Sequence, residues 1–173
     1  MDDKVKLKSI SDDDLVSELW ARDVRFLMGR NANASPLLSP TNLIASLAQS
    51  ENARVRLALI PLLLRHPELS AEVEKADESL PSQISRIVLR FYYTAAIILQ
   101  RKYQERLKEI FGTQTQLPDL YSNKLGVSLS KDHEQSLADL AKLHQTLSGQ
   151  TINWLGTYEH AAERLIKHME KFK

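Results

Sequence analysis

The segment that most constrains the fold runs from Ser82 to Phe111, beginning just after Pro81 and ending just before Gly112. It predicts one helix of about 45 Å, at 1.5 Å of rise per residue, with the glycine as its stop. The first half of the segment is apolar on almost every side, whereas Arg101 to Glu109 is highly charged. We therefore expect a central helix whose first half is the hub of the core and whose second half projects toward solvent or a partner.

The rest of the chain also favours helix. Leu, Ala, Glu, Lys, Arg and Gln are abundant, only five of the 173 residues are Gly, and β-branched runs of period two are absent. Capping residues and apolar spacing predict further helices over residues 12–28, 40–49, 53–67 and 131–148, and from Thr151 or Tyr158 to the C-terminus. The fold class that we predict is all-α, a compact multi-helix bundle of about six helices with one long central helix.

Residues 53–67 carry apolar side chains around nearly the whole helix, so we expect this helix to be buried on most sides and kinked at Pro61. Together with the helix before it, the stretch from Ser39 to His66 forms a short helix, a turn and a second helix containing Val-Arg-x-Ala. This pattern resembles one HEAT-type helical repeat. The resemblance implies a single HEAT-like hairpin inside a compact bundle, because no second copy occurs at a fixed period.

We expect one folded unit. Residues 1–10 are predicted to form a flexible tail and residues 11–173 a single helical domain. Residues 112–130, which are rich in Thr and Gln and contain Pro and Gly, are a possible internal boundary, although their apolar cluster favours a packed loop. The expected core residues are Leu59, Leu63, Val88, Phe91, Ala95, Leu99, Leu140 and Leu165.

Charge and cysteine content exclude several function classes. The 23 Lys and Arg nearly balance the 22 Asp and Glu, so bulk charge does not predict nucleic-acid binding. The chain has no Cys, which excludes disulfides, thiolate zinc sites, iron–sulfur clusters and cysteine nucleophiles. Without a recognisable signal peptide or an apolar run long enough for a membrane span, a cytoplasmic protein with no membrane association is expected.

The terminal helix is the clearest amphipathic segment. One side is expected to carry the apolar residues Trp154, Tyr158, Ala161, Ala162, Leu165 and Met169, and the other the basic residues His160, Arg164, Lys167, His168 and Lys171. Because His160 and Arg164 are four residues apart, they are neighbours able to grip a phosphate or a carboxylate. The alternative is a solvated basic face balanced by Glu163 and Glu170. The two histidines lie about 12 Å apart along the axis, too far to share a metal.

A second basic line follows the long helix through Arg86, Arg90, Arg101 and Lys108. Arg86 and Arg90 lie in its most apolar part, where an unpaired guanidinium is costly, so both need partners. Phosphates or acidic residues of another protein are one possibility. The other is an intramolecular carboxylate from the acidic segment Glu68, Glu72, Glu74, Asp77 and Glu78.

The known catalytic motifs point away from an enzyme. Gly-rich phosphate loops, nucleophile elbows, His-Glu-x-x-His and Glu-x-x-His are all absent, so we expect no metal and no cofactor. The Arg164-Leu165-Ile166-Lys167-His168 stretch resembles the Arg and His pair of HEPN-type ribonucleases, although that family places four to six residues between the two and this chain places three. That resemblance implies catalysis by Arg164 and His168 meeting across a dimer axis.

These observations favour a non-catalytic, intracellular interaction protein, an adaptor or small subunit that docks a protein partner as a homo-oligomer or in a heteromeric complex. The alternative is a nucleic-acid-associated subunit of a bacterial defence or toxin–antitoxin assembly, and the third hypothesis is a HEPN-like ribonuclease. The residues expected to contact protein or phosphate are Arg86, Arg90, Arg101, His160, Arg164, Lys167 and His168.

Overall fold

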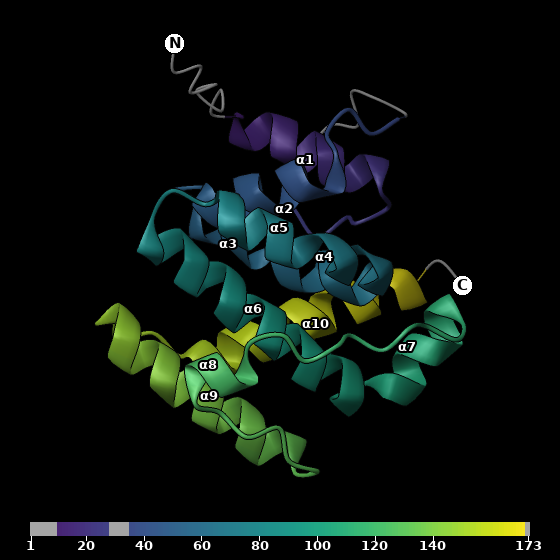
Figure 1. The fold of residues 1–173 in the computed structure, drawn as a ribbon. Helices are drawn as coiled ribbons and strands as arrows, with labels where there is room; N and C mark the ends of the chain where they lie inside the picture. The colour runs from purple at the N-terminus through teal and green to yellow at the C-terminus, as the bar shows by residue number, and fades with distance from the viewer. Residues whose placement is uncertain (1–9, 28–34, 172–173) are drawn as a thin grey trace.

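The computed structural model describes residues 10–27 and 35–171, which contain helices and no strand (Figure 1). Their elements are α1 (Asp12–Ala21), α2 (Pro40–Gln49), α3 (Ala53–Leu57), α4 (Leu59–Arg65), the 3-10 helix η1 (Pro67–Glu72), α5 (Val73–Ser79), α6 (Gln83–Lys102), α7 (Gln104–Phe111), α8 (Ser122–Leu125), α9 (His133–Ser148) and α10 (Trp154–Glu170). The all-α prediction is confirmed. About six helices is an approximation, because two segments expected as single helices are each divided in two.

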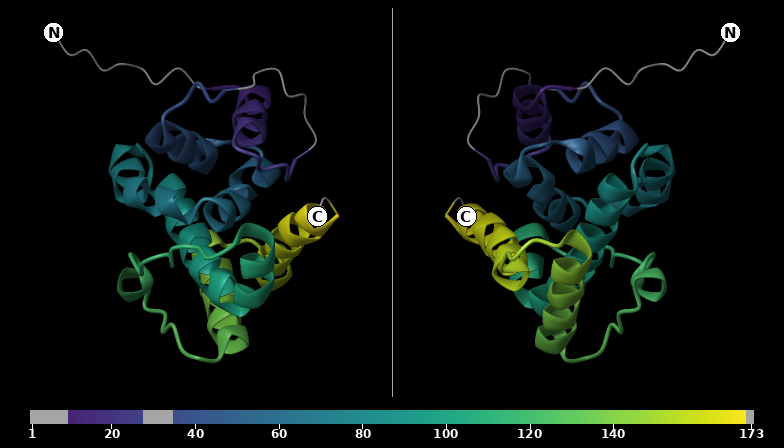
Figure 2. Two further views of the ribbon diagram at one scale, coloured as in Figure 1. Left: turned by 90° about the vertical axis from the view of Figure 1, so that its right-hand side faces the viewer. Right: turned by 90° about the vertical axis from the view of Figure 1, so that its left-hand side faces the viewer.

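Helix α6 runs through the middle of the molecule, as expected for the central helix (Figure 1). It packs most extensively against α4 and α9, and α10 packs across α4, α9 and α7. Helices α1 to α5 lie on one side of α6 and helices α8 and α9 on the other, a division that the side views also show (Figure 2). Among the described residues, no helix has the length and the apolar character needed to cross a bilayer.

The hub of the core begins one to two turns later in α6 than the sequence suggested. Residues 89–100 of α6 are buried almost without exception, whereas Val88 is only half-buried and Ile84 is 77% exposed. The first turns of α6 therefore extend past the helices that cover its middle. The other seven expected core residues are confirmed as buried: Leu59, Leu63, Phe91, Ala95, Leu99, Leu140 and Leu165.

The expected single helix from Ser82 to Phe111 is wrong, because it breaks at Tyr103, where φ is −103° and ψ is 20°. Beyond the break, α7 turns to pack against α10, and Leu107 is 1% exposed. Burying this leucine removes apolar surface from water and so favours the bend. The charged half of the segment is thus part of the fold and does not project from it.

Two more helix boundaries differ from the sequence pattern. The segment 53–67 divides at Ala58, which agrees with the expected kink, because Pro61 has no N–H to donate to the turn before it. The first helix ends at Ala21, well before the expected Met28, which lies outside the described residues. Val24 and Phe26 after it are buried on either side of exposed Arg25, an alternation typical of extended backbone.

The loop over residues 112–130 is packed, and the second helix of the expected hairpin is divided into α3 and α4. Helix α2 contacts α3 and α4, and it contacts α5 more extensively; the likeness of this pair to a HEAT repeat stays a prediction. In the loop over residues 112–130, Leu117, Tyr121 and Val127 are buried as part of the main core cluster. The loop therefore packs on the body of the protein, as the apolar cluster predicted.

Candidate functional site on helix α10

Helix α10 begins where the Asn153 side chain accepts a hydrogen bond from Gly156 N at 3.0 Å. Its predicted apolar side is confirmed, except that Met169 is only half-buried. The buried residues of this helix are Trp154, Tyr158, Ala161, Ala162, Leu165 and Ile166. With that side against the core, the charged residues occupy the rest of the circumference.

Three glutamates of α10 turn toward α6 and α7, where each has a partner. The three pairs are Lys102 Nζ with Glu159 Oε1 at 3.1 Å, the Tyr103 hydroxyl with Glu163 Oε1 at 3.2 Å, and Arg106 Nε with Glu170 Oε1 at 3.1 Å. Lys102 also lies 3.0 Å from Glu134 Oε1 on α9. Burial lowers the pKa of Lys102, but its hydrogen bonds to Glu134 and Glu159 outweigh that effect and raise it. The acidic side of α10 is therefore used in holding three helices together.

Around α10, the three glutamates lie between the apolar side, which faces the core, and the basic residues. At 100° per residue, the three glutamates span about 40° of the helix and the five basic residues about 100°. A hollow is lined by Glu163 and by these five basic residues, which are His160, Arg164, Lys167, His168 and Lys171. We call these five residues the α10 basic face.

The α10 basic face has little acidic balance. Of the two glutamates that the alternative interpretation assigned to that role, Glu170 is paired with Arg106, whereas Glu163 accepts a hydrogen bond from the neutral Tyr103 hydroxyl and lines the hollow. Within the described part of the chain, no carboxylate lies within ion-pair distance of Arg164, Lys167 or Lys171. The Arg164 guanidinium instead lies 5.3 Å from the ring centroid of Phe26, which fixes its position on the surface.

The second basic line is not one site. Arg90 donates from Nε and Nη2 to the Asp77 carboxylate at 2.8 and 3.0 Å, and this hydrogen bonding raises the pKa of Arg90. Arg86 donates to the backbone oxygens of Leu80 and Glu78 at 3.2 and 3.4 Å. The intramolecular partner predicted for Arg90 is thus confirmed.

Arg101 lies at the far end of α6 and lines a different hollow, together with Lys108. This hollow shares no residue with the α10 basic face. The seven predicted contact residues therefore fall into three places, and four of them, His160, Arg164, Lys167 and His168, lie together on α10.

Sequence reasoning missed a buried histidine beneath α10. The His144 ring is 2% exposed and stacks on Trp154 at 3.6 Å and on Phe91 at 4.5 Å between centroids. Its Nδ1 shares a hydrogen bond with the Tyr158 hydroxyl. Burial lowers the pKa of His144 to about 4, so the ring is neutral at pH 7. The signal was present, since His144 follows Leu137, Leu140 and Ala141 on one helical face.

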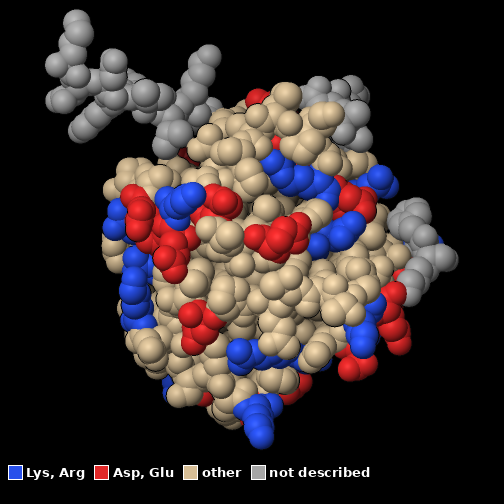
Figure 3. Space-filling model, turned by 45° about the vertical axis from the view of Figure 1, so that its right-hand side comes forward, with Lys and Arg blue, Asp and Glu red and all other residues tan. Residues whose placement is uncertain are grey.

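No group of three metal-binding side chains occurs within residues 10–27 and 35–171. Arg164 and His168 lie one turn apart and line the same hollow, and their pairing in a ribonuclease stays a prediction. On the face shown in Figure 3, basic and acidic groups lie beside one another between large uncharged areas, so that face has no broad surface of one sign. The chain matches no protein-family model, no curated protein and no solved structure.

Proposed function

We propose that this chain is a non-catalytic interaction protein of the cytoplasm that docks an acidic segment of a protein partner on the α10 basic face. The observation that carries the proposal is the separation of charge around α10. Its glutamates pair with α6 and α7, while Arg164, Lys167 and Lys171 face solvent. Cations without intramolecular carboxylates gain most from a partner that supplies them.

The dimensions of the face suit a short peptide segment. His160 and Lys171 are separated by about 16 Å along the helix axis, at 1.5 Å of rise per residue. An extended peptide covers that length with about five residues, at 3.3 Å each. Arg164 is positioned by Phe26 and presents a planar fork that binds a carboxylate through two parallel hydrogen bonds.

A nucleic acid fits the face less well. Non-specific binding of single strands uses exposed aromatic rings on which bases stack. Tyr92 and Tyr93 of the long helix are buried, and Tyr103 is half-buried with its hydroxyl bound to Glu163. With a net charge of +1, the chain also lacks the overall basic character that phosphate backbones favour.

The test is fluorescence anisotropy with a labelled, glutamate-rich peptide, a neutral peptide of the same length and a short single-stranded RNA. We expect the acidic peptide to bind, and its affinity to fall as salt is added. The variant R164E/K167E should weaken binding by at least about tenfold, because two attractive charges become repulsive. The control K124E/K131E makes the same change in net charge at exposed positions in and after α8 and should bind as the wild type does.

Three outcomes would contradict the proposal. If the acidic peptide does not bind, or if both variants lose affinity for it equally, α10 is not the docking site. If RNA binds more tightly than the peptide, and R164E/K167E abolishes that binding, the nucleic-acid hypothesis replaces the docking proposal. Far-UV circular dichroism of both variants confirms that the helices are intact, which matters because Arg164 also contacts Phe26.

A further inference from the structure

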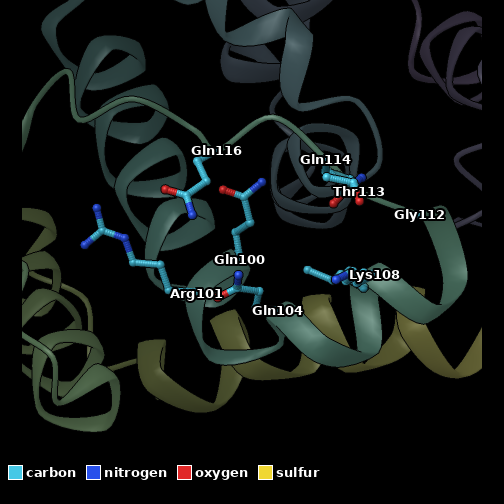
Figure 4. A pocket seen from close by; sticks show the side chains of 9 residues that line it. Gln100, Arg101, Gln104, Lys108, Gly112, Thr113, Gln114 and Gln116 are labelled. Carbon is cyan, nitrogen blue, oxygen red and sulfur yellow. The ribbon is translucent and has the colours of Figure 1, made fainter.

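A second hollow lies between the bend of α6 and α7 and the segment over residues 112–116 (Figure 4). Four glutamines and two cations line it: Gln100, Gln104, Gln114, Gln116, Arg101 and Lys108. None of the residues that line it is acidic. The hollow is separate from the α10 basic face and shares no residue with it.

Two of the glutamines hold the walls of the hollow in place. Gln100 is buried, and its Nε2 donates to Thr115 O at 3.0 Å while its Oε1 accepts from Leu117 N at 2.8 Å. Gln114 Nε2 donates to Leu64 O, in the last turn of α4, at 2.9 Å. The segment over residues 112–117 is therefore fastened to both α6 and α4, and the hollow is formed before any ligand enters.

The other polar groups remain available to a ligand. The side chains of Gln104, Gln116, Arg101 and Lys108 make no hydrogen bond or ion pair with the described residues. In Figure 4, Lys108 reaches into the hollow from α7, Gln104 lies at the start of α7, Gln116 extends from the loop over residues 112–117, and Arg101 lies at the outer edge. An ammonium thus faces amides across an open space, and Leu107 forms part of the lining.

We propose that this hollow binds a small organic anion, a molecule that carries a phosphate or carboxylate and a hydrogen-bonding body. Lys108 holds the anionic group, because no carboxylate competes for it in the hollow. The amides of Gln104 and Gln116 each offer a donor and an acceptor to the neutral part of the ligand.

The experiment follows the side-chain amide signals of the glutamines in ¹H–¹⁵N spectra of the full chain, assigned with Q104A and Q116A. The probes are citrate, adenosine monophosphate and inorganic phosphate, with adenosine as the uncharged control. We expect citrate or adenosine monophosphate to shift the signals of Gln104 and Gln116, and K108M to weaken that binding about tenfold through loss of its charge. K131M, which removes an exposed lysine elsewhere, and R164E/K167E should both bind as the wild type does.

The proposal is overturned if no anionic probe moves these signals, or if adenosine moves them as strongly as adenosine monophosphate. It also fails if K108M binds like the wild type, or if R164E/K167E abolishes the shifts, because the anion would then lie on α10. Retained backbone spectra of K108M exclude unfolding as the cause of lost binding.

Discussion

At the scale of single residues, His144 has the clearest physical consequence. It lies between Phe91 and Trp154 and shares its Nδ1 with the Tyr158 hydroxyl. A charged imidazolium in that position would lose its hydration without gaining a carboxylate, and this is why burial lowers its pKa to about 4. The folded state therefore requires the neutral ring.

The pH dependence of stability follows from that pKa. Between pH about 6.5 and about 4, His144 binds a proton in the unfolded chain and not in the folded one, so stability is full above pH 6.5 and falls as the pH drops. We expect a loss of about 3 kcal/mol in the free energy of unfolding across this range, from 1.36 kcal/mol per pKa unit. Urea unfolding at several pH values measures it.

The variant H144F separates this effect from the titration of carboxylates. It keeps an aromatic ring in the stack but leaves the Tyr158 hydroxyl buried without its partner, at a cost of about 2 kcal/mol at pH 7. H144F/Y158F removes that cost. Both variants should lose less stability than the wild type between pH 6.5 and 4. Equal losses in all three proteins would show that His144 does not titrate as its burial requires.

At the scale of elements, a buried ion pair joins α1 to the lead-in of α2. The Glu18 carboxylate accepts from Leu37 N at 2.9 Å, from Leu38 N at 3.2 Å and from Arg22 Nη1 at 2.6 Å. Arg22 in turn donates to Leu38 O at 2.6 Å. Both side chains are about nine-tenths buried, so each charge depends on the other.

We predict that E18Q lowers the free energy of unfolding by about 3 kcal/mol, because it leaves Arg22 buried without an anion. The amide also places a donor against the backbone N–H groups of Leu37 and Leu38, so hydrogen exchange at those two amides should accelerate. The matched control is E105Q, at an exposed position of α7, and it should change neither measurement. Unchanged exchange in E18Q would mean that other contacts hold this segment.

Helix ends were predictable where a local signal fixes them. Ser39 and Pro40 start α2, and α9 ends at Ser148 before Gly149, whose φ of +68° favours glycine. The break at Tyr103 was not predictable from spacing, because the residues on either side are ordinary helix formers. It is set by contacts across the fold, since Leu107 and Arg106 reach α10 only if the chain bends there.

The candidate site was predictable to the same extent. The amphipathic spacing of α10 brought out His160, Arg164, Lys167 and His168. The partners of the α10 glutamates were not predictable from the sequence. They depend on the position of α7, which brings Tyr103 and Arg106 to Glu163 and Glu170. Likewise, the glutamine-lined hollow lies between the α6–α7 bend and residues 112–116, and only the fold places these two segments side by side.

At the scale of the whole molecule, the core is continuous. One cluster of buried residues extends from Leu15 in α1 to Ile166 in α10, and it includes the loop over residues 112–130. A continuous core favours cooperative unfolding, because no part can open without exposing apolar surface of the rest. The expectation of a single helical domain can therefore be tested directly.

The two tryptophans report on opposite ends of the chain, Trp20 in α1 and Trp154 in α10. We predict that urea unfolding of W20F, followed by Trp154 fluorescence, has the same midpoint as far-UV circular dichroism of that variant. The same agreement is expected for W154F, followed by Trp20. Stability itself will differ between the variants, so each is compared only with its own dichroism. Separate transitions would place a boundary between the two halves.

The pairing of the α10 glutamates also has a kinetic consequence. With a net charge of +1, the whole protein exerts almost no average pull on a distant anion. Lys102 and Arg106 neutralise Glu159 and Glu170, so the remaining positive potential lies on one side of α10. A partner within about 8 Å, the screening distance at physiological ionic strength, is turned toward that side before contact. Ionic strength should then govern how often encounters are correctly oriented, and much less how long the complex lasts.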